Sequence, residues 1–253
     1  QGIDPKSLKT EYPIDLYNFS FTNYTSPYGE CYFEAAKKKF NDIKGGVFIL
    51  EVNPFILSNY EENMTSENEF FSECETAPSN MWLMNARPNF EYIVRNYADD
   101  FKSLIGVKPH PYAIYLHNNG WLEIDIPHDT TFFRENTEEK VNDYNELIEK
   151  MKPSTARWKA LKKTIEFFSE YGEVHLVRIP VSPQMEEIEE RYYPNFEAEI
   201  RRLSNELNVH YLNFFNLKDS LSFTDGNHLH KSSSWKFSKI LGKEIRERSS
   251  DFN

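Results

Sequence analysis

The chain has 253 residues, of which 39% are hydrophobic and 15% aromatic, so it can bury the core of one large globular domain. Its formal net charge of -11 and its pI near 5.2 exclude the clustered lysine and arginine surfaces that bind phosphate backbones, and we expect no nucleic acid partner. No window approaches the roughly 18 apolar residues that cross a bilayer, which predicts a soluble chain.

The chain termini and the cysteines bear on where the protein works. The first residues lack the pattern of a signal peptide, and because the chain starts at Gln1 we expect that a preceding segment was removed. Cys31 and Cys74 are too few for a disulfide framework and match no metal-binding spacing. We expect two separate free thiols that behave as small hydrophobic side chains. A single disulfide is the alternative if the protein works outside the cytoplasm.

In chain order, the N-terminal part predicts strands alternating with a helix. Residues 14–21 have strand character, and residues 27–40 have a helical pattern. Residues 47–52 form a nearly continuous apolar run, which is typical of a parallel strand buried on both faces. Asn53 and Pro54 end that strand.

The stretch that follows does not continue this alternation. Residues 89–104 have a helical pattern, and residues 112–126 hold two alternating runs around Asn-Asn-Gly at 118–120. That tripeptide is a strong β-hairpin signal, because asparagine and glycine tolerate the positive φ of a tight turn. We interpret residues 54–152 as an insertion over the active face of a single domain.

The C-terminal part returns to strands and helices. Residues 174–181 and 209–215 are predicted strands, and they flank a long predicted helix at 184–207 with acidic and basic residues at i,i+4 spacing. A last helix at 232–248 has an apolar face formed by Trp235, Phe237, Ile240, Leu241 and Ile245. This alternation predicts the α/β class with a mostly parallel sheet, whose ligands bind at the carboxyl ends of the strands.

The sequence Phe-Thr-Asp-Gly-Asn-His-Leu at residues 223–229 is the strongest functional signal. It follows a predicted buried strand and leads into the last helix, so we expect it at the carboxyl edge of the sheet. The spacing lets Asp225 accept a hydrogen bond from the ring of His228, which leaves the far ring nitrogen free to act as a general base. The pair predicts half of a catalytic triad.

Three segments carry a resemblance to a known group of enzymes. They are Asn-Phe-Ser-Phe-Thr-Asn-Tyr-Thr-Ser-Pro-Tyr-Gly at 18–29, Ile-Leu-Glu-Val-Asn-Pro at 49–54, and the block at 223–229 with its closing helix. Together they resemble the SGNH/GDSL hydrolase superfamily, and within it the bacterial envelope branch of D-alanyl-transfer and polysaccharide O-acetylation proteins. The resemblance skips the insertion and implies a three-layer α/β/α, flavodoxin-like domain over residues 1–253.

The resemblance also implies roles for individual residues. By position, Asn23 is implied as a backbone donor to an oxyanion hole and Asn53 as a side-chain donor, while Asp225 orients His228. In such sites each donor contributes roughly 10²–10³ to the rate. The chemistry implied is hydrolysis or transfer of an acyl ester, and no cofactor is implied.

The nucleophile of this superfamily is a serine in a Gly-x-Ser turn after the first, central strand, and the N-terminus here contains no such turn. We expect that serine upstream of Gln1. Residues 1–253 alone should therefore be inactive. Ser20 and Ser26 are substitutes in principle, although each fits a strand end or a helix N-cap. The superfamily usually has glycine where this chain has Ser20 or Asn23, and also where it has Glu51.

Further expectations about partners follow from the resemblance. The implied substrate is an acyl ester of an envelope carbohydrate or glycopolymer, and the implied location is the cell envelope, outside the cytoplasmic membrane. Membrane contact would come only through a segment absent from this chain. Loss of a central strand leaves the edges of its two neighbours open. We expect a rearranged sheet order, the hairpin, or a second copy in a homo-oligomer to fill the gap.

Two other enzymatic hypotheses use ionisable side chains. Asp225, His228 and His230 could hold a metal in a metal-dependent hydrolase, with one further ligand from His110, His117 or His128. Paired acids of a glycosidase could come from Glu123, Asp125, Asp129 and Glu138, although in so acidic a chain a solvated face explains them better.

A third hypothesis is a non-catalytic carbohydrate-binding or scaffold protein. Its sugar-stacking side chains would be Trp82, Trp121, Tyr112 and Tyr115, although core packing or cross-strand pairing explains most of them better. Arg178, near the end of its predicted strand, could hold an anionic substrate group, but we expect it to pair with an acidic neighbour.

Overall fold

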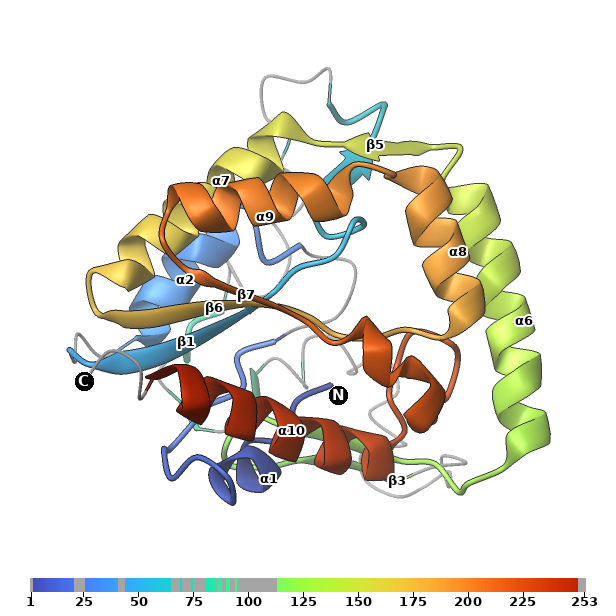
Figure 1. The fold of residues 1–253 in the computed structure, drawn as a ribbon, viewed down its shortest axis with the longest axis horizontal. Helices are drawn as coiled ribbons and strands as arrows, with labels where there is room; N and C mark the ends of the chain where they lie inside the picture. The colour runs from blue at the N-terminus through green and yellow to red at the C-terminus, as the bar shows by residue number, and fades with distance from the viewer. Residues whose placement is uncertain are drawn as a thin grey trace.

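The computed structural model describes residues 2–20, 26–40, 44–64, 69, 74, 81–84, 86–87, 90–91, 94 and 113–249. It shows a mixed α/β chain around a parallel three-stranded sheet (Figure 1). The strands are β1 (Gly46–Glu51), β6 (Gly172–Arg178) and β7 (His210–Asn213), in the order β1–β6–β7. The expected α/β class and parallel pairing are therefore confirmed.

Helices cover both faces of this sheet, as a parallel sheet requires (Figure 1). On one face lie α2 (Glu30–Lys39), α7 (Thr155–Ser169) and α9 (Phe196–Glu206). On the other face lie α1 (Pro5–Lys9) and α10 (Lys231–Ser249). Because all three strands run in the same direction, their carboxyl ends lie together at one edge of the sheet.

Each face of the sheet has its own hydrophobic core. Leu176 and Val177 are neighbours in β6, yet they belong to different cores because successive side chains of a strand point to opposite faces. Fully buried members of the first core include Leu57, Leu161, Ile165, Leu176 and Ile200, and those of the second include Leu8, Val177, Phe237, Leu241 and Ile245. Burial of each such side chain stabilises the fold by about 1.5–3 kcal/mol.

Two helices stand at the carboxyl edge of the sheet (Figure 1). They are α6 (Thr130–Leu147) and α8 (Pro183–Tyr192), which lie side by side and are linked by a hydrogen bond from Arg191 to the side chain of Asn145. α6 was not predicted, although Asp129 caps its first turn and no glycine or proline interrupts its 18 residues. The 3-10 helix η2 (Phe215–Ser220) follows β7.

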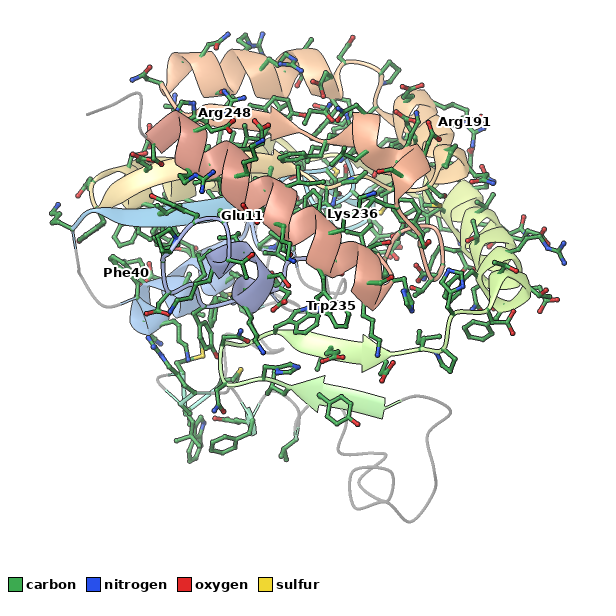
Figure 2. The ribbon with its side chains drawn as sticks, turned by 60° about the horizontal axis from the view of Figure 1, so that its bottom comes forward. Glu11, Phe40, Arg191, Trp235, Lys236 and Arg248 are labelled. Atoms are coloured by element: carbon green, nitrogen blue, oxygen red, sulfur yellow. A yellow bond between two sulfur atoms is a disulfide. The ribbon has the colours of Figure 1, made fainter. Side chains whose placement is uncertain are left out.

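The remaining strands form two small antiparallel pairs. β2 (Ser58–Tyr60) pairs with β5 (Met151–Pro153). The predicted hairpin is confirmed as β3 (Ala113–Leu116) and β4 (Leu122–Asp125), with Gly120 at a φ of +80° in its turn. The hairpin lies along α10, on the side that carries Trp235 (Figure 2).

Three sequence expectations are wrong in detail. Residues 14–20 are not a strand but an irregular segment, in which Asn18 donates its backbone N–H to the carbonyl of Asn119. The helix expected at 184–207 is interrupted between α8 and α9, because Pro194 lacks an N–H and disfavours a helical conformation in the residue before it. Trp235 is 39% exposed, outside the α10 core.

The helix expected at 89–104 lies largely outside the described residues, although residues 90, 91 and 94 are helical.

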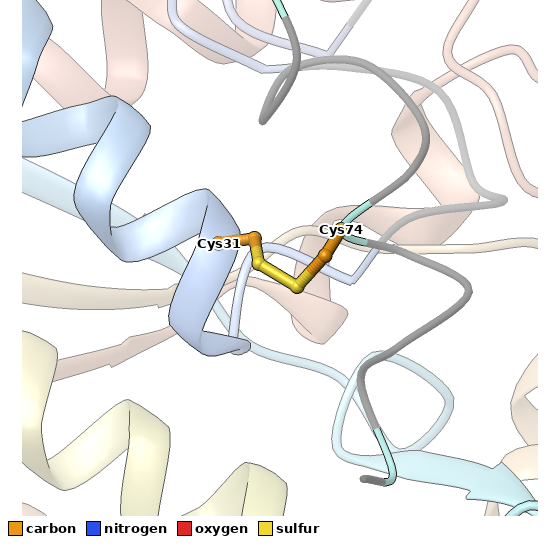
Figure 3. The surroundings of a disulfide bond; sticks show 2 residues. All are labelled: Cys31 and Cys74. Atoms are coloured by element: carbon orange, nitrogen blue, oxygen red, sulfur yellow. A yellow bond between two sulfur atoms is a disulfide. The ribbon is translucent and has the colours of Figure 1, made fainter.

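The two cysteines also differ from expectation. Cys31 of α2 and Cys74 form a disulfide with a Cα–Cα distance of 5.3 Å (Figure 3). The cross-link ties α2 to the segment after β2. The two cysteines are 43 residues apart in sequence, and the loop that their bond closes restricts the unfolded chain.

A buried histidine pair makes the sheet sensitive to acid. His175 of β6 is fully buried and stacks on its partner His210 of β7, with ring centroids 5.1 Å apart. Burial, followed by the nearby His210, lowers the pKa of His175 from 6.5 to about 4, while Glu173 partly opposes this shift. The neutral ring is therefore the form that the folded protein accommodates.

We expect the free energy of unfolding to fall as the pH drops from 6.5 towards 4. In that range the unfolded chain protonates this histidine and the folded chain does not, which costs roughly 1.4 kcal/mol per pH unit. In His175→Gln this part of the acid dependence should disappear. Urea denaturation at pH 7 and pH 5 measures it, with the exposed His128→Gln as control. Equal acid dependence in both variants would contradict the assignment.

Candidate functional site

The block at 223–229 forms a closed loop at the carboxyl edge of the sheet. Phe223 and Leu229 pair as an antiparallel bridge, and the backbone N–H of Thr224 donates to the carbonyl of His228 at 2.8 Å. Gly226 lies between them with a φ of +85°, a conformation that side-chain-bearing residues rarely adopt. Its carbonyl accepts a 2.7 Å hydrogen bond from the N–H of Ser182, which joins the loop to the start of α8.

Asp225 organises the loop through both oxygens of its carboxylate. Oδ2 lies 2.8 Å from Nδ1 of the His228 ring, and Oδ1 accepts the backbone N–H groups of Asn227 and His228 at 3.2 and 2.9 Å. Burial alone would raise the pKa of Asp225, but the hydrogen bonds from His228 and the charge of Lys140, 4.0 Å away, lower it below its ordinary 3.8. The carboxylate therefore stays ionised.

Nε2, the other ring nitrogen of His228, is the atom that can accept a proton from a substrate or nucleophile. An ionised acceptor at Nδ1 places the ring hydrogen there and leaves Nε2 as the lone-pair nitrogen. Within the described residues Nε2 has no hydrogen-bond partner, and the side chain is 31% exposed. The geometry is that of an oriented general base on a partly exposed side chain.

Asn53 follows directly after β1 and Val52, at the same edge of the sheet. Its Oδ1 accepts the backbone N–H groups of Phe55 and Ile56, each at 3.0 Å, and this fixes which end of the amide is oxygen. Nδ2 lies 3.2 Å from Oε1 of Glu51. The amide nitrogen is thus the end of Asn53 that can donate to a ligand.

Aromatic and charged contacts connect the Asn53 turn to the Asp225 loop. The Phe55 ring meets Tyr144 of α6 edge-on at 4.7 Å between centroids. Burial, followed by the charges of Glu189 and Asp225, raises the pKa of Tyr144 to about 12, and a hydrogen bond with Asn227 acts in the opposite direction. Tyr144 therefore contacts both segments. Sequence reasoning missed it because α6 itself was not predicted.

The resembling segment at 18–29 lies against the one at 49–54 and the turn that follows it. The Ser26 hydroxyl donates to the carbonyl of Ile56 at 2.6 Å, and the Tyr28 hydroxyl donates to the carbonyl of Glu51. Ser26 is 9% exposed and its oxygen also accepts the N–H of Tyr28, so it has a structural role instead of that of a nucleophile. Asn23, the implied backbone donor, lies outside the described residues.

The structure argues against the metal hypothesis at His230. One ring nitrogen of His230 lies 3.0 Å from the carbonyl oxygen of Ile126 and the other 2.8 Å from the Ser232 hydroxyl. Both ligating atoms are therefore occupied by protein groups. Across the described part of the chain, no three His, Cys, Asp or Glu side chains are grouped to hold a metal ion. His110 lies outside that part, and His117 pairs with Glu123 at 2.8 Å.

The carboxylates considered for a glycosidase have local structural partners. They are Glu123 with His117, Asp125 with Lys231, Asp129 as the N-cap of α6, and Glu138 with Arg134.

Arg178 pairs with acidic neighbours, as expected, and binds Glu189 at 2.9 Å and Glu197 at 3.0 Å. Only 6% of Arg178 is exposed, and burial raises the pKa of Glu189 to about 7 in spite of this pairing.

The aromatic residues of the carbohydrate-binding hypothesis separate into two groups. Trp121 is buried and stacks on His117, so it belongs to the hairpin core. Trp82 and Tyr115 are 88% and 53% exposed, while Tyr112 lies outside the described residues. The exposed pair comes from different segments.

Comparisons with known proteins supply no identification. No family model matches the chain, and neither the curated proteins nor the solved structures contain a match. None of the helices in the described ranges is long and apolar enough to cross a membrane.

We expect Gly226→Ala to destabilise the protein more than Gly45→Ala. Both glycines have positive φ, +85° and +76°, which alone costs an alanine about 1–2 kcal/mol. A Cβ on Gly226 would also lie 3.1 Å from each of three side chains, Met185, Ser182 and Thr137, whereas one on Gly45 meets no described atom within 4 Å. Urea denaturation measures the difference. Equal losses would show that the close contacts of Gly226 do not constrain the loop.

Proposed function

We propose that the chain forms the base-bearing part of an SGNH-type serine esterase or O-acyltransferase. The observation that carries this proposal is the Asp225–His228 pair, in a loop at the carboxyl edge of a parallel sheet, with a partly exposed His228 whose Nε2 has no partner among the described residues. In this mechanism His228 takes a proton from a serine hydroxyl as the serine attacks the ester carbonyl, and returns it to the leaving group. Asp225 orients the ring.

Asn53 is the proposed side-chain donor to the oxyanion. A tetrahedral intermediate places negative charge on the former carbonyl oxygen, and a fixed N–H aimed at that oxygen stabilises it. The two hydrogen bonds to Oδ1 support this role, because they hold the amide so that its nitrogen is the end available for donation. The placement of helices on both faces of the sheet supports the three-layer fold that the resemblance implies.

We propose that the nucleophilic serine lies in a turn after a strand outside residues 1–253, and that this strand pairs with the open edge of β1. The N–H groups of Gly46 and Val52 point towards β6, so the alternate residues Val47, Ile49 and Glu51 direct theirs away from it. No strand in the described ranges pairs with that second edge. Neither the hairpin of β3 and β4 nor a rearranged order of the described strands fills it.

The path of the chain after Gly2 agrees with such a strand. Gly2 lies against Ile179, which follows β6. A parallel strand on the open edge of β1 would end at this same edge of the sheet, and a short turn would lead from it to Gly2. The serine in that turn would then lie near the loop that carries His228.

An extracytoplasmic envelope location and an acyl-ester substrate on a glycan complete the proposal. The disulfide between Cys31 and Cys74 supports the location, because disulfides persist in oxidising compartments and are rare in the cytosol. A second candidate, non-catalytic glycan binding, is favoured by the exposed ring of Trp82. It requires a gene that encodes no Gly-x-Ser turn upstream.

A serine-directed fluorophosphonate probe tests the proposal. We expect no stoichiometric labelling of residues 1–253 and labelling of a chain extended upstream through a Gly-x-Ser turn. In the extended chain His228→Gln should slow labelling by about 10²–10⁴-fold, because the serine loses its general base. His128→Gln, an exposed histidine, is the control. Labelling of the 253-residue chain would place the nucleophile within it, and an unlabelled extended chain would overturn the proposal.

A further inference from the structure

Glu51 is the last residue of β1 and sits two residues before Asn53, on the edge that carries the site. Its Oε1 lies 3.2 Å from Nδ2 of Asn53. Oδ1 of Asn53 already accepts the N–H groups of Phe55 and Ile56. Three of the four hydrogen-bonding positions of this amide are therefore used. One N–H of Nδ2 remains, and it has no partner among the residues that the structure describes.

The charge around Glu51 connects it to the base. Surrounding protein raises the pKa of the Glu51 carboxyl from 4.5, whereas the charge of the N-terminal amino group, then the hydrogen bond from Asn53 and the charge of His228, lower it. The carboxylate is therefore close enough to His228 for their charges to interact. Within the described ranges, no lysine or arginine side chain forms an ion pair with Glu51, and its side-chain hydrogen bond there is the one with Asn53.

We propose that Glu51 is a positioning residue for Asn53, whose carboxylate accepts one Nδ2 hydrogen and directs the other towards the reacting carbonyl. This inference rests on the proposed function. The backbone bonds to Oδ1 fix which end of the amide is nitrogen, and the acceptor at Glu51 further restricts rotation of the amide plane about the Cβ–Cγ bond of Asn53. A hydrogen bond to an ionised acceptor is about twice as strong as a neutral one, which suits a positioning contact.

Glu51 also imposes an electrostatic cost. Its negative charge lies beside the position where a second negative charge would develop on the oxyanion, and like charges repel. Replacement by glutamine keeps an oxygen that can accept from Asn53 and removes the charge. Replacement by alanine removes both. The two variants therefore separate positioning from repulsion.

Nuclear magnetic resonance of the ¹⁵N-labelled 253-residue chain tests the contact directly. The side-chain amide signals of Asn53 are assigned by their loss in Asn53→Asp, which keeps the oxygen that accepts from Phe55 and Ile56. We expect the two Nδ2 hydrogens to differ in chemical shift and to titrate together with Glu51, with a midpoint above 4.5. Glu51→Gln should keep the difference and abolish the titration, and Glu51→Ala should reduce the difference.

Glu61→Gln is the matched control, because Glu61 is an exposed glutamate in the turn after β2. It should leave the Asn53 titration unchanged. Asn53 signals that do not respond to pH, or that still titrate in Glu51→Gln, would overturn the inference. The backbone amide spectrum of each variant reports whether it is folded, so a lost signal is not confused with an unfolded chain.

The catalytic consequence is measured in the extended, nucleophile-bearing chain with a neutral ester. Glu51→Ala should lower kcat roughly tenfold with little change in KM, a fraction of the 10²–10³ that such a donor supplies. Glu51→Gln should restore most of the loss. An unchanged kcat in Glu51→Ala overturns the positioning role. If Asn53 titrates with Glu51 but the probe labels no serine, the proposed function fails while the Glu51–Asn53 contact stands.

Discussion

The parallel pairing of β1, β6 and β7 is the constraint on which the rest of the structure depends. Parallel strands end at the same edge of their sheet, and the register places Glu51 beside Val177 and Arg178 beside Asn213. Residues that are far apart in sequence therefore meet at one edge. The Asn53 turn, the loop that starts α8 and the 223–229 loop all leave the sheet there, and α6 closes over them through Tyr144.

The distribution of charge at this edge separates supporting groups from available ones. Arg178 neutralises Glu189 and Glu197 beneath the site, and its guanidinium lies 4.0 Å over the Phe215 ring, so this cluster is closed to ligands. Asp225 is satisfied by His228 and its backbone neighbours. Among the described groups of the Asp225–His228 pair and the Asn53 amide, Nε2 of His228 and one N–H of Asn53 have no hydrogen-bond partner, and they are the base and the donor of the proposed acyl transfer.

Much of the fold followed from local pattern. Continuous apolar runs identified β1 and β6, the Asn-Asn-Gly turn identified the hairpin, and the periodicity of Phe237, Leu241 and Ile245 identified α10. The predicted elements were wrong where a single residue interrupts a longer periodic pattern, or where a strand-like segment has no neighbouring strand to pair with. Pro194 divides an otherwise continuous helical pattern, and residues 14–20 have strand composition but no neighbouring strand that pairs with them in the described structure.

The sequence by itself determined the Asp225–His228 pair and the approximate place of Asn53, because these depend on short spacings and on the end of a buried strand. Only the tertiary structure decided that Tyr144 joins the Asn53 turn to the 223–229 loop, that Cys31 and Cys74 pair, and that the nitrogens of His230 are occupied. Each of these contacts joins segments at least 43 residues apart, except the local bond of His230 to Ser232. Residue type and spacing carry no information on which distant segments meet, since that depends on how both cores pack.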